Sequence, residues 1–445
     1  MSVSLIAIIL MIQFAVGIYR LKWGIAIFIF IFVVFPTDIL FLDFFSLNFI
    51  RASIVLAFFN VLHYHYVKRK ILFFSRYKSY FYSILIFTLF LMPSFTSAQF
   101  SEGGTRGIYL YFTYYFIEQF LPGIIIMFVI ETELDFYFYV KCILCSVLCM
   151  CLFGFYEYYT DDNPLQDWLK TVNTGILVEY AEETRFGFSR RVQSTSWHPI
   201  AYGSYLSMYI ILFFIFIIKG YKSKVYKKTN LYFNIVILMS IANIVLTASR
   251  APWLCTLTTI SLILVINFKF FMRRYFVLKT MLLILITPVF LYFVINLLSY
   301  VMNSQVSGSS LSMRFDQFSY IANRMGGALY IGYGPTGIEE FFKTGQFGNA
   351  LGFESIIFVY LVDFGLIGLI GLIFLYYRTA KSLGGRNKSF YTSYFYVILI
   401  SHLIFVVLSG ELRTFRIFWM LYSMIFIISK KELLNNKLQT AILLA

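Results

Sequence analysis

The chain has 445 residues, of which 60% are hydrophobic and only 13% are charged. Ordinary soluble proteins carry about 25% charged residues, so this composition excludes a soluble globular protein. The net charge of +15 does not call for a nucleic-acid partner, because the position of the basic residues relative to the predicted membrane spans accounts for it.

The hydropathy pattern predicts an all-α, polytopic integral membrane protein. A helix needs about 20 mainly apolar residues to cross the hydrocarbon core of a bilayer. Pro36, Asp38 and Asp43 interrupt the pattern near the N-terminus, which leaves twelve and thirteen helices as alternative counts. The expected helices occupy residues 3–19, 23–42, 47–66, 79–97, 109–130, 136–156, 198–218, 230–248, 251–268, 281–300, 354–377, 390–409 and 413–429.

Basic residues gather in alternate loops, and this predicts the orientation of the chain. They cluster around residues 20–22, 68–78, 141, 219–228, 269–279, 378–388 and 430–437. Loops rich in Lys and Arg stay on the cytoplasmic side of the membrane. We therefore expect a cytoplasmic C-terminus and, with thirteen helices, an N-terminus on the outer side.

Two loops on the predicted outer side are long, whereas every predicted cytoplasmic loop is short. The long loops span residues 157–198 and 301–354, and we treat residues 1–445 as a single transmembrane domain around them. This asymmetry predicts that the activity is located at the outer face. The sequence has no phosphate-binding G-x-x-x-x-G-K-[ST] pattern, which argues against an ATP-driven pump. Cys142 and Cys145 have the C-x-x-C spacing that occurs in metal and redox motifs. We interpret them as small apolar residues of a membrane helix, and we expect no metal or other cofactor.

The first outer loop carries Arg190 and Arg191 shortly before His198 and Pro199. Proline suits the first turn of a helix, and the hydroxyl side chains at 194–196 are candidate caps for the helix that follows. This helix begins at the outer face, so its unpaired N–H groups and the positive end of its dipole would point outward. The sequence therefore predicts a candidate anion site here.

The same arrangement recurs at Ser249, Arg250, Ala251 and Pro252. One predicted helix ends there and the next begins, which places an arginine at an outward-facing helix N-terminus. An arginine and a helix dipole together attract phosphate strongly. The alternative interpretation is an interfacial arginine that reaches toward lipid headgroups.

The second outer loop carries Arg314 and Arg324 on a segment with helical spacing of apolar residues. A turn at residues 332–334 follows, with the sequence Gly-Tyr-Gly. Glu354 opens the next predicted helix, where neighbouring helices would bury it. Burial of a carboxylate in such a place is a common feature of catalytic sites.

Ionisable residues inside the predicted helices form a further group. In hydrocarbon such residues are costly and often functional, and structural ion pairing is the other interpretation. The group consists of Arg51, Glu118, Asp363, Glu411, Arg413 and Arg416.

Four short motifs occur in a fixed order relative to the predicted helices. They are Trp197-His198-Pro199, Ser249-Arg250-Ala251, Met313-Arg314 with the later Gly332-Tyr333-Gly334, and Gly365-Leu366-Ile367-Gly368. Together they resemble the O-antigen ligase and polymerase superfamily of bacterial surface-polysaccharide assembly. The resemblance extends over roughly residues 185–430.

The resemblance implies roles for several of these residues. Arg250 and Arg314 would engage the diphosphate of an undecaprenyl-diphosphate-linked sugar donor, and we add Arg190, Arg191 and Arg324 as further substrate-binding candidates. Transfer would need no metal ion. As general base, Glu354 is our first candidate and His198 the second.

The resemblance also implies a location and partners. The protein would lie in the bacterial cytoplasmic (inner) membrane, with its active site facing the periplasm or the cell exterior. Membrane lipid, a flippase and a chain-length regulator would be its partners, for O-antigen or for capsule synthesis.

A repeat-unit polymerase is the interpretation that the sequence favours. O-antigen ligases of this superfamily place a His before the last signature helix, whereas the second outer loop contains no His. The alternatives are an O-antigen ligase, a non-enzymatic lipid-linked oligosaccharide flippase or transporter, and a cell-wall glycan polymerase that shares the lipid carrier.

Overall fold

The computed structural model describes most of the chain. The described residues are 3–35, 40–42, 47–68, 78–96, 108–109, 111–172, 190–222, 230–267, 318–319, 321, 323–335, 337, 355–383, 390–409 and 414–444.

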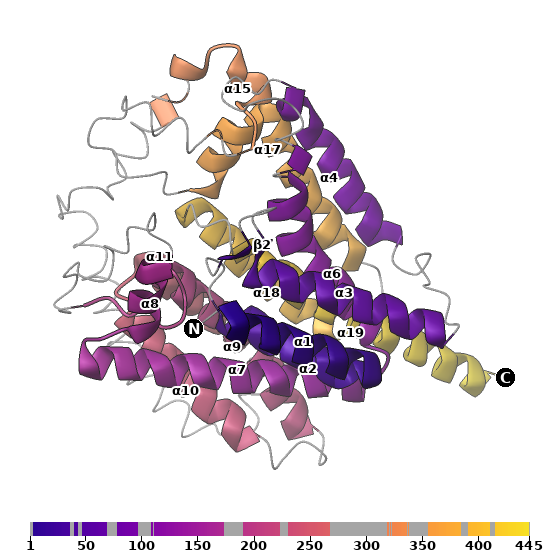
Figure 1. Ribbon diagram of the computed structural model, residues 1–445. Helices are drawn as coiled ribbons and strands as arrows, with labels where there is room; N and C mark the ends of the chain where they lie inside the picture. Colours follow the sequence, from indigo (N-terminus) through magenta and orange to yellow (C-terminus); the bar gives the residue numbers. More distant parts are fainter. Residues whose placement is uncertain are drawn as a thin grey trace.

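Long apolar helices make up most of the described chain (Figure 1). They are α1 (Val3–Tyr19), α2 (Leu21–Val34), α3 (Phe49–Val67), α4 (Lys78–Thr96), α6 (Leu121–Val129), α7 (Glu133–Thr160), α9 (Pro199–Lys222), α10 (Asn230–Leu246), α11 (Arg250–Ile266), α17 (Ile356–Leu383), α18 (Phe390–Leu408) and α19 (Thr414–Leu444). A π-helix, η3 (Tyr111–Phe120), leads into α6. Two short helices, α8 (Pro164–Val172) and α15 (Ala328–Ile331), belong to the segments that connect the long helices.

The predicted helices coincide with described helices along most of the chain, and the prediction for 281–300 lies outside the described residues. The end predicted for the helix 23–42 is wrong. Helix α2 stops at Val34, and β1 (Leu40–Leu42) pairs with β2 (Leu47–Asn48) in an antiparallel hairpin. Pro36 has no N–H to continue a helix, which explains the early stop. In the described chain this hairpin is the only sheet.

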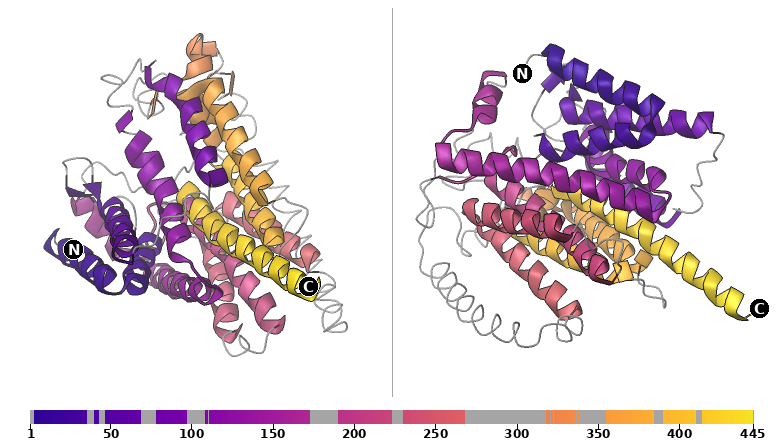
Figure 2. Two further views of the ribbon diagram at one scale, coloured as in Figure 1. Left: turned by 90° about the vertical axis from the view of Figure 1, so that its right-hand side faces the viewer. Right: turned by 90° about the horizontal axis from the view of Figure 1, so that it is seen from below.

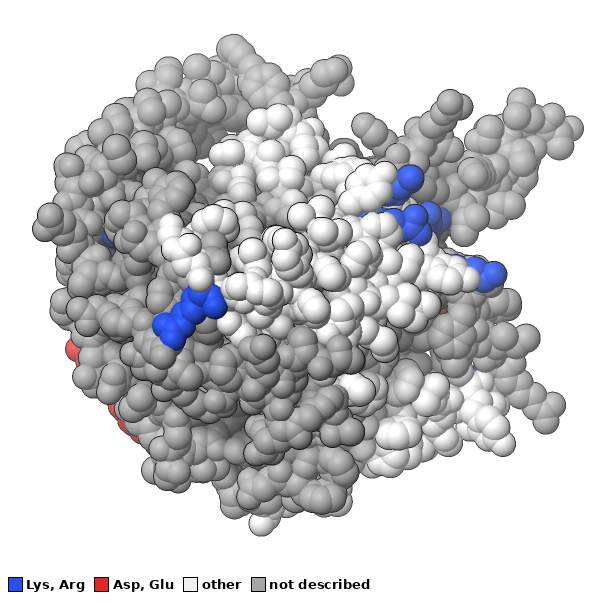
Figure 3. All heavy atoms as spheres, turned by 90° about the horizontal axis from the view of Figure 1, so that it is seen from above, with Lys and Arg blue, Asp and Glu red and all other residues white. Residues whose placement is uncertain are grey.

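The described helices suit a lipid environment. Six helical segments are long and apolar enough to cross a membrane, namely α4, η3 with α6, α7, α9, α17 and α18, and four shorter helices are also apolar. Large apolar side chains such as Leu85, Leu238 and Ile373 are exposed on their surfaces. In the face shown in Figure 3, uncharged atoms cover most of the described surface. These findings confirm an all-α polytopic membrane protein, whereas the count of twelve or thirteen spans stays a prediction.

The helix ends that were predicted to be cytoplasmic meet at one end of the bundle. Lys22 at the start of α2 pairs with Asp135 at the start of α7, with 3.0 Å between the Nζ and carboxylate oxygen atoms. Lys219 near the end of α9 pairs with Glu133, also at the start of α7. The opposite end of α7 lies beside α8 and the start of α11 (Figure 1). These contacts therefore place the start of α2, the start of α7 and the end of α9 at the same end of the bundle.

Helix α9 lies at the centre of the C-terminal half of the bundle. It packs against α7, α10, α11, α18 and α19, and most of its side chains are buried. A Cβ atom at Gly203 would lie 2.7 Å from Cβ of Pro252 on α11, so this glycine lets the two helices approach closely. The N-terminal helices α1, α2 and α3 group together at one side, and the C-terminal end of α19 extends beyond the bundle (Figure 2).

Candidate functional site

Three segments that are distant in sequence meet at the end of α7, α9, α10 and α11 that was predicted to face outward. We call this region the outer junction and define it as residues 157–166, 190–198 and 246–250. A backbone hydrogen bond of 3.1 Å from Val192 N to Leu246 O joins the second segment to the third. The region therefore combines the end of the first outer loop with the short connection between α10 and α11.

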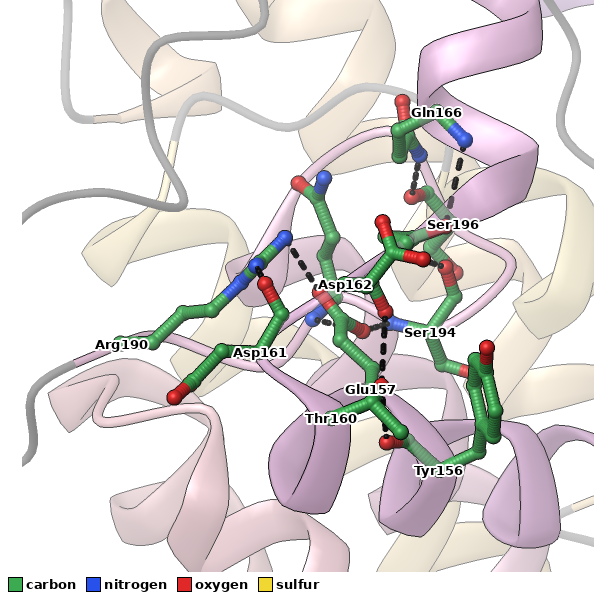
Figure 4. A network of polar contacts seen from close by, with 11 residues as sticks. Tyr156, Glu157, Thr160, Asp161, Asp162, Gln166, Arg190, Ser194 and Ser196 are labelled. Atoms are coloured by element: carbon green, nitrogen blue, oxygen red, sulfur yellow. Dashed lines mark hydrogen bonds and ion pairs between the residues drawn. The ribbon is translucent and has the colours of Figure 1, made fainter.

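Glu157 organises the outer junction from the last turns of α7 (Figure 4). Its carboxylate is fully buried and accepts backbone N–H groups from Gln193 at 3.2 Å and Ser194 at 2.6 Å. The guanidinium of Arg190 lies 3.7 Å from the second carboxylate oxygen and also donates to Asp161 O. The loop that was predicted to begin at residue 157 is therefore helical up to residue 160, and Glu157 belongs to the packed interior.

Two buried amides hold the loop from the other side. Asn163 Nδ2 donates to Ser194 O at 2.9 Å, and Gln166 Nε2 donates to Ser196 O at 2.7 Å. Asn163 also caps α8, because its Oδ1 accepts the N–H of Gln166 at 3.1 Å. Helix α8 thus braces residues 194–196 against α7.

Arg191 connects the first outer loop to the Ser-Arg motif. Its side chain is 1% exposed. Nη2 donates to Ser249 Oγ at 2.9 Å, and Nε donates to Thr247 O at 3.4 Å. Arg191 therefore lies directly beside the residue that precedes Arg250, and two arginines that are 59 positions apart share one region.

Backbone strain is concentrated in the outer junction. In the described part of the chain, the non-glycine residues with positive φ are Asp161 (52°), Ser194 (52°) and Ala248 (46°), and all three lie in this region. The left-handed conformation is unfavourable for residues with a Cβ, and such strain gathers at functional sites. Each of the three segments therefore carries one strained residue.

Arg250 is the first residue of α11 and is half-buried. Ser249 precedes it in an extended conformation, but its side chain does not cap the helix. Instead, Ser249 Oγ donates to Thr247 O at 2.9 Å and accepts the bond from Arg191. The N-terminus of α11 is thus positioned by Arg191 and carries its own arginine, as an anion site would require.

His198 is half-buried at the start of α9. Its Nδ1 atom accepts the N–H of Ile200 at 3.0 Å. The prediction that a hydroxyl at 194–196 caps this helix is therefore wrong, because the backbone and amide contacts described above fix those residues and leave the cap to the imidazole. An imidazole whose Nδ1 accepts a hydrogen bond carries its proton on Nε2 when it is neutral.

Helix α17 is broken at Gly365, within the motif Gly365-Leu366-Ile367-Gly368. Gly365 has φ 64° and ψ −167°, a conformation open almost only to glycine. The turn at residues 332–334 packs onto this break, since Tyr333 N donates to Val362 O and Gly334 N donates to Asp363 O, both at 2.9 Å. The two glycine motifs of the sequence are therefore one structural element.

The carboxylate-bearing Asp363 is buried at this break and is 2% exposed. A Cβ atom at Gly337 would lie 3.6 Å from its Oδ1 atom, so the second outer loop covers the aspartate. Broken helices at membrane depth are tolerated where they line a site or are buried in protein, and in transporters they mark binding sites. The break is therefore a second candidate region for a functional site.

The remaining predicted site residues are divided between the described and undescribed parts of the chain. Arg314 and Glu354 lie outside the described residues, so the proximity of Arg250 and Arg314 stays a prediction. Arg324 is exposed on the segment whose buried residues Ile321 and Met325 pack against α17. The structure thus brings Arg190, Arg191, His198 and Arg250 into one region, and places Arg324 on the segment that covers the outer part of α17.

Glu157, Asn163 and Gln166 belong to the site but are not marked by any motif in the sequence. All three lie where an apolar segment passes into polar sequence, and this pattern predicts a loop. The pair Asn163-Pro164 was a usable signal, because Asn before Pro is typical of a helix start.

Comparison with known protein families gives a match to part of the chain. Residues 235–373 match the O-antigen ligase family model, a region that begins in α10 and includes Arg250, Arg314, the turn at 332–334 and the break at Gly365. No curated protein sequence matches significantly, and no solved structure does. The match over residues 235–373 supports a relationship between this chain and the O-antigen ligase and polymerase superfamily.

Proposed function

We propose that this protein polymerises undecaprenyl-diphosphate-linked oligosaccharide repeat units of a bacterial surface polysaccharide. The family match supports a function of the ligase and polymerase kind in surface-polysaccharide assembly. The reaction would be glycosyl transfer at the outer leaflet of the cytoplasmic membrane. A hydroxyl of one lipid-linked unit attacks the anomeric carbon of the growing glycan, the anomeric carbon–oxygen bond breaks, and undecaprenyl diphosphate leaves.

The observation that carries this proposal is the hydrogen bond from Arg191 to Ser249. It brings the arginine-rich end of the first outer loop to the Ser249–Ala251 motif inside the family domain. A departing diphosphate develops negative charge, and guanidinium groups beside a helix N-terminus stabilise such charge without a metal ion. Arg191 would hold the start of α11 in place, and Arg250 would contact the diphosphate.

A general base would take the proton of the attacking hydroxyl. Glu354 remains our first candidate, since it immediately precedes Ser355, where the chain enters α17. For His198, the bond from Ile200 N–H occupies Nδ1. The neutral ring would therefore present an N–H at Nε2, which is better suited to donating a hydrogen bond to the diphosphate than to removing a proton.

The second candidate function is an O-antigen ligase, and the family match favours it because the matching family carries that description. A ligase would move the glycan to a different acceptor lipid. The polymerase is preferred because the second outer loop, residues 301–354, contains no His where ligases of the superfamily carry one.

The test uses the purified full chain in lipid nanodiscs with synthetic lipid-linked repeat units. One arm supplies a second repeat unit as acceptor, and the other supplies a lipid A-core acceptor. Elongated glycan in the first arm alone is the expected result. Product in the second arm alone would identify a ligase, and absence of glycan transfer in both arms would contradict the enzymatic proposal.

A further inference from the structure

Arg416 is a buried positive charge in the first turn of α19. The residue is 3% exposed. Its guanidinium carbon lies 5.2 Å from the ring centroid of Phe32 and 5.4 Å from that of Tyr205. Within the described part of the chain no carboxylate pairs with it, and its Nε and Nη1 atoms have no hydrogen-bond partner.

Arg51 is a buried arginine with a structural role, and its contacts differ from those of Arg416. Arg51 is also 3% exposed, but its Nε lies 2.6 Å from a carboxylate oxygen of Glu118. The same carboxylate oxygen accepts a hydrogen bond from Asn48 at 3.1 Å. Within the described part of the chain, the guanidinium of Arg416 contacts the faces of aromatic rings. Such contacts return less free energy than the desolvation of a guanidinium costs.

The surroundings of Arg416 provide further hydrogen-bond donor capacity. Tyr209 lies one turn after Tyr205 on α9 and interacts electrostatically with Arg416. Its buried hydroxyl has no hydrogen-bond partner among the described residues. Guanidinium N–H groups are donors only, and a tyrosine hydroxyl can donate as well. The missing component is therefore an acceptor that carries negative charge and several oxygen atoms.

The position of this donor group suits a second lipid substrate. Tyr205 follows His198 by seven residues, which is a rise of about 10 Å along α9, so Arg416 lies deeper in the bundle than the outer junction. It lies where α2 of the N-terminal group approaches α9 and α19. A polymerase that joins two lipid-linked units has to hold two diphosphates at once, and the outer junction would hold one of them.

We propose that Arg416, together with the hydroxyl of Tyr209, binds the diphosphate of a second polyprenyl-linked substrate. This inference rests on the proposed function, which requires two lipid-linked substrates. The ligand chemistry is a diphosphate ester, which supplies the acceptor oxygens and the negative charge that no described residue provides for the buried guanidinium. Arg250 and Arg416 would then serve different lipids, and neither would replace the other.

The test counts bound polyprenyl diphosphate per chain in nanodiscs of neutral lipid, with the full chain and a radiolabelled probe. Wild-type protein is expected to bind two molecules, whereas Arg416→Met and Arg250→Ala are each expected to bind one. Arg416→Lys keeps the charge but loses the planar fork, so we expect the second site to weaken about 10-fold. Arg416→Met that binds two molecules with wild-type affinity would overturn the proposal.

Thermal unfolding separates this role from a structural one. Removing an unpaired buried charge does not destabilise a fold, so Arg416→Met is expected to unfold at the wild-type temperature or above. The matched control is Arg51→Met, which leaves Glu118 buried and unpaired and is expected to unfold at a lower temperature while still binding two probe molecules when folded. Arg416→Met that unfolds early, like Arg51→Met, would mark Arg416 as structural.

Two competitors distinguish the source of the diphosphate chemistry. Inorganic pyrophosphate is expected to displace the probe from the Arg416 site, whereas anionic phosphatidylglycerol is expected to leave it bound. If phosphatidylglycerol displaced the probe as well as pyrophosphate does, the site would be a contact for lipid headgroups in general, and the proposal would be overturned. If the protein bound two probe molecules but transferred no glycan, the proposed function would be contradicted and this inference would stand. If the protein transferred glycan but Arg416→Met still bound two probe molecules, this inference would be overturned and the proposed function would stand.

Discussion

Arg250→Ala is expected to lower kcat/KM for glycan transfer about 100-fold, equivalent to about 2.7 kcal/mol of transition-state stabilisation. The reason is that Arg250 stands at the N-terminus of α11 beside the Arg191–Ser249 contact, where it would stabilise the departing diphosphate. The measurement is the initial rate of glycan elongation in nanodiscs at several concentrations of the lipid-linked donor.

Two further variants make this result specific. Arg250→Lys is expected to recover only part of the activity, because an ammonium group cannot form the paired contacts of a guanidinium with a diphosphate. Lys381 is exposed near the C-terminal end of α17. Lys381→Ala therefore serves as a matched loss of one positive charge and should retain the wild-type rate. An Arg250→Ala protein as active as Lys381→Ala would remove Arg250 from the mechanism.

Gly365→Ala is expected to destabilise the protein by about 2–3 kcal/mol, because the backbone conformation there is open almost only to glycine. A Cβ atom would in addition lie 2.5 Å from Ile331 N, so the segment that leads into the turn at 332–334 could not stay seated on the break in α17. We expect a lower thermal unfolding temperature in detergent and, in the folded fraction, a loss of glycan transfer.

The chain supplies a control for this substitution close to the same contact. At Gly327, a Cβ atom would meet no other atom within 4 Å, and its φ is not positive. Gly327→Ala is therefore expected to unfold at the wild-type temperature and to keep its activity. If Gly365→Ala unfolded at the same temperature as Gly327→Ala, the broken form of α17 would not be the native one.

The fold was largely predictable because its main determinant is local. A run of about 20 apolar residues specifies a membrane helix with little reference to the rest of the chain. The long helices from α3 to α11 were therefore found within a few residues of their observed ends, whereas the short helix α8 was not predicted. The end of α2 was not, because Pro36 and the hairpin at residues 40–48 interrupt an otherwise apolar run. The break in α17 was marked only by Gly365, and glycines inside membrane helices are common.

The candidate site was predictable in its residue types but not in its connections. Arg190, Arg191 and Arg250 were singled out because arginines beside helix N-termini attract phosphate. The bond from Arg191 to Ser249 depends on how α7, α9 and α10 pack, which no local pattern reveals. Glu157 was missed for the same reason, since a carboxylate at the end of an apolar helix has the same sequence signature whether it faces water or a buried loop.

The most direct test of the account is to locate a lipid diphosphate on the protein. A photoreactive polyprenyl diphosphate would be cross-linked to the wild-type chain in nanodiscs, and the labelled peptides would be identified by mass spectrometry. The account predicts labelling within residues 190–198 and 247–252 that excess unlabelled polyprenyl diphosphate prevents and that Arg250→Ala reduces. Labelling that leaves both segments unmodified would contradict it.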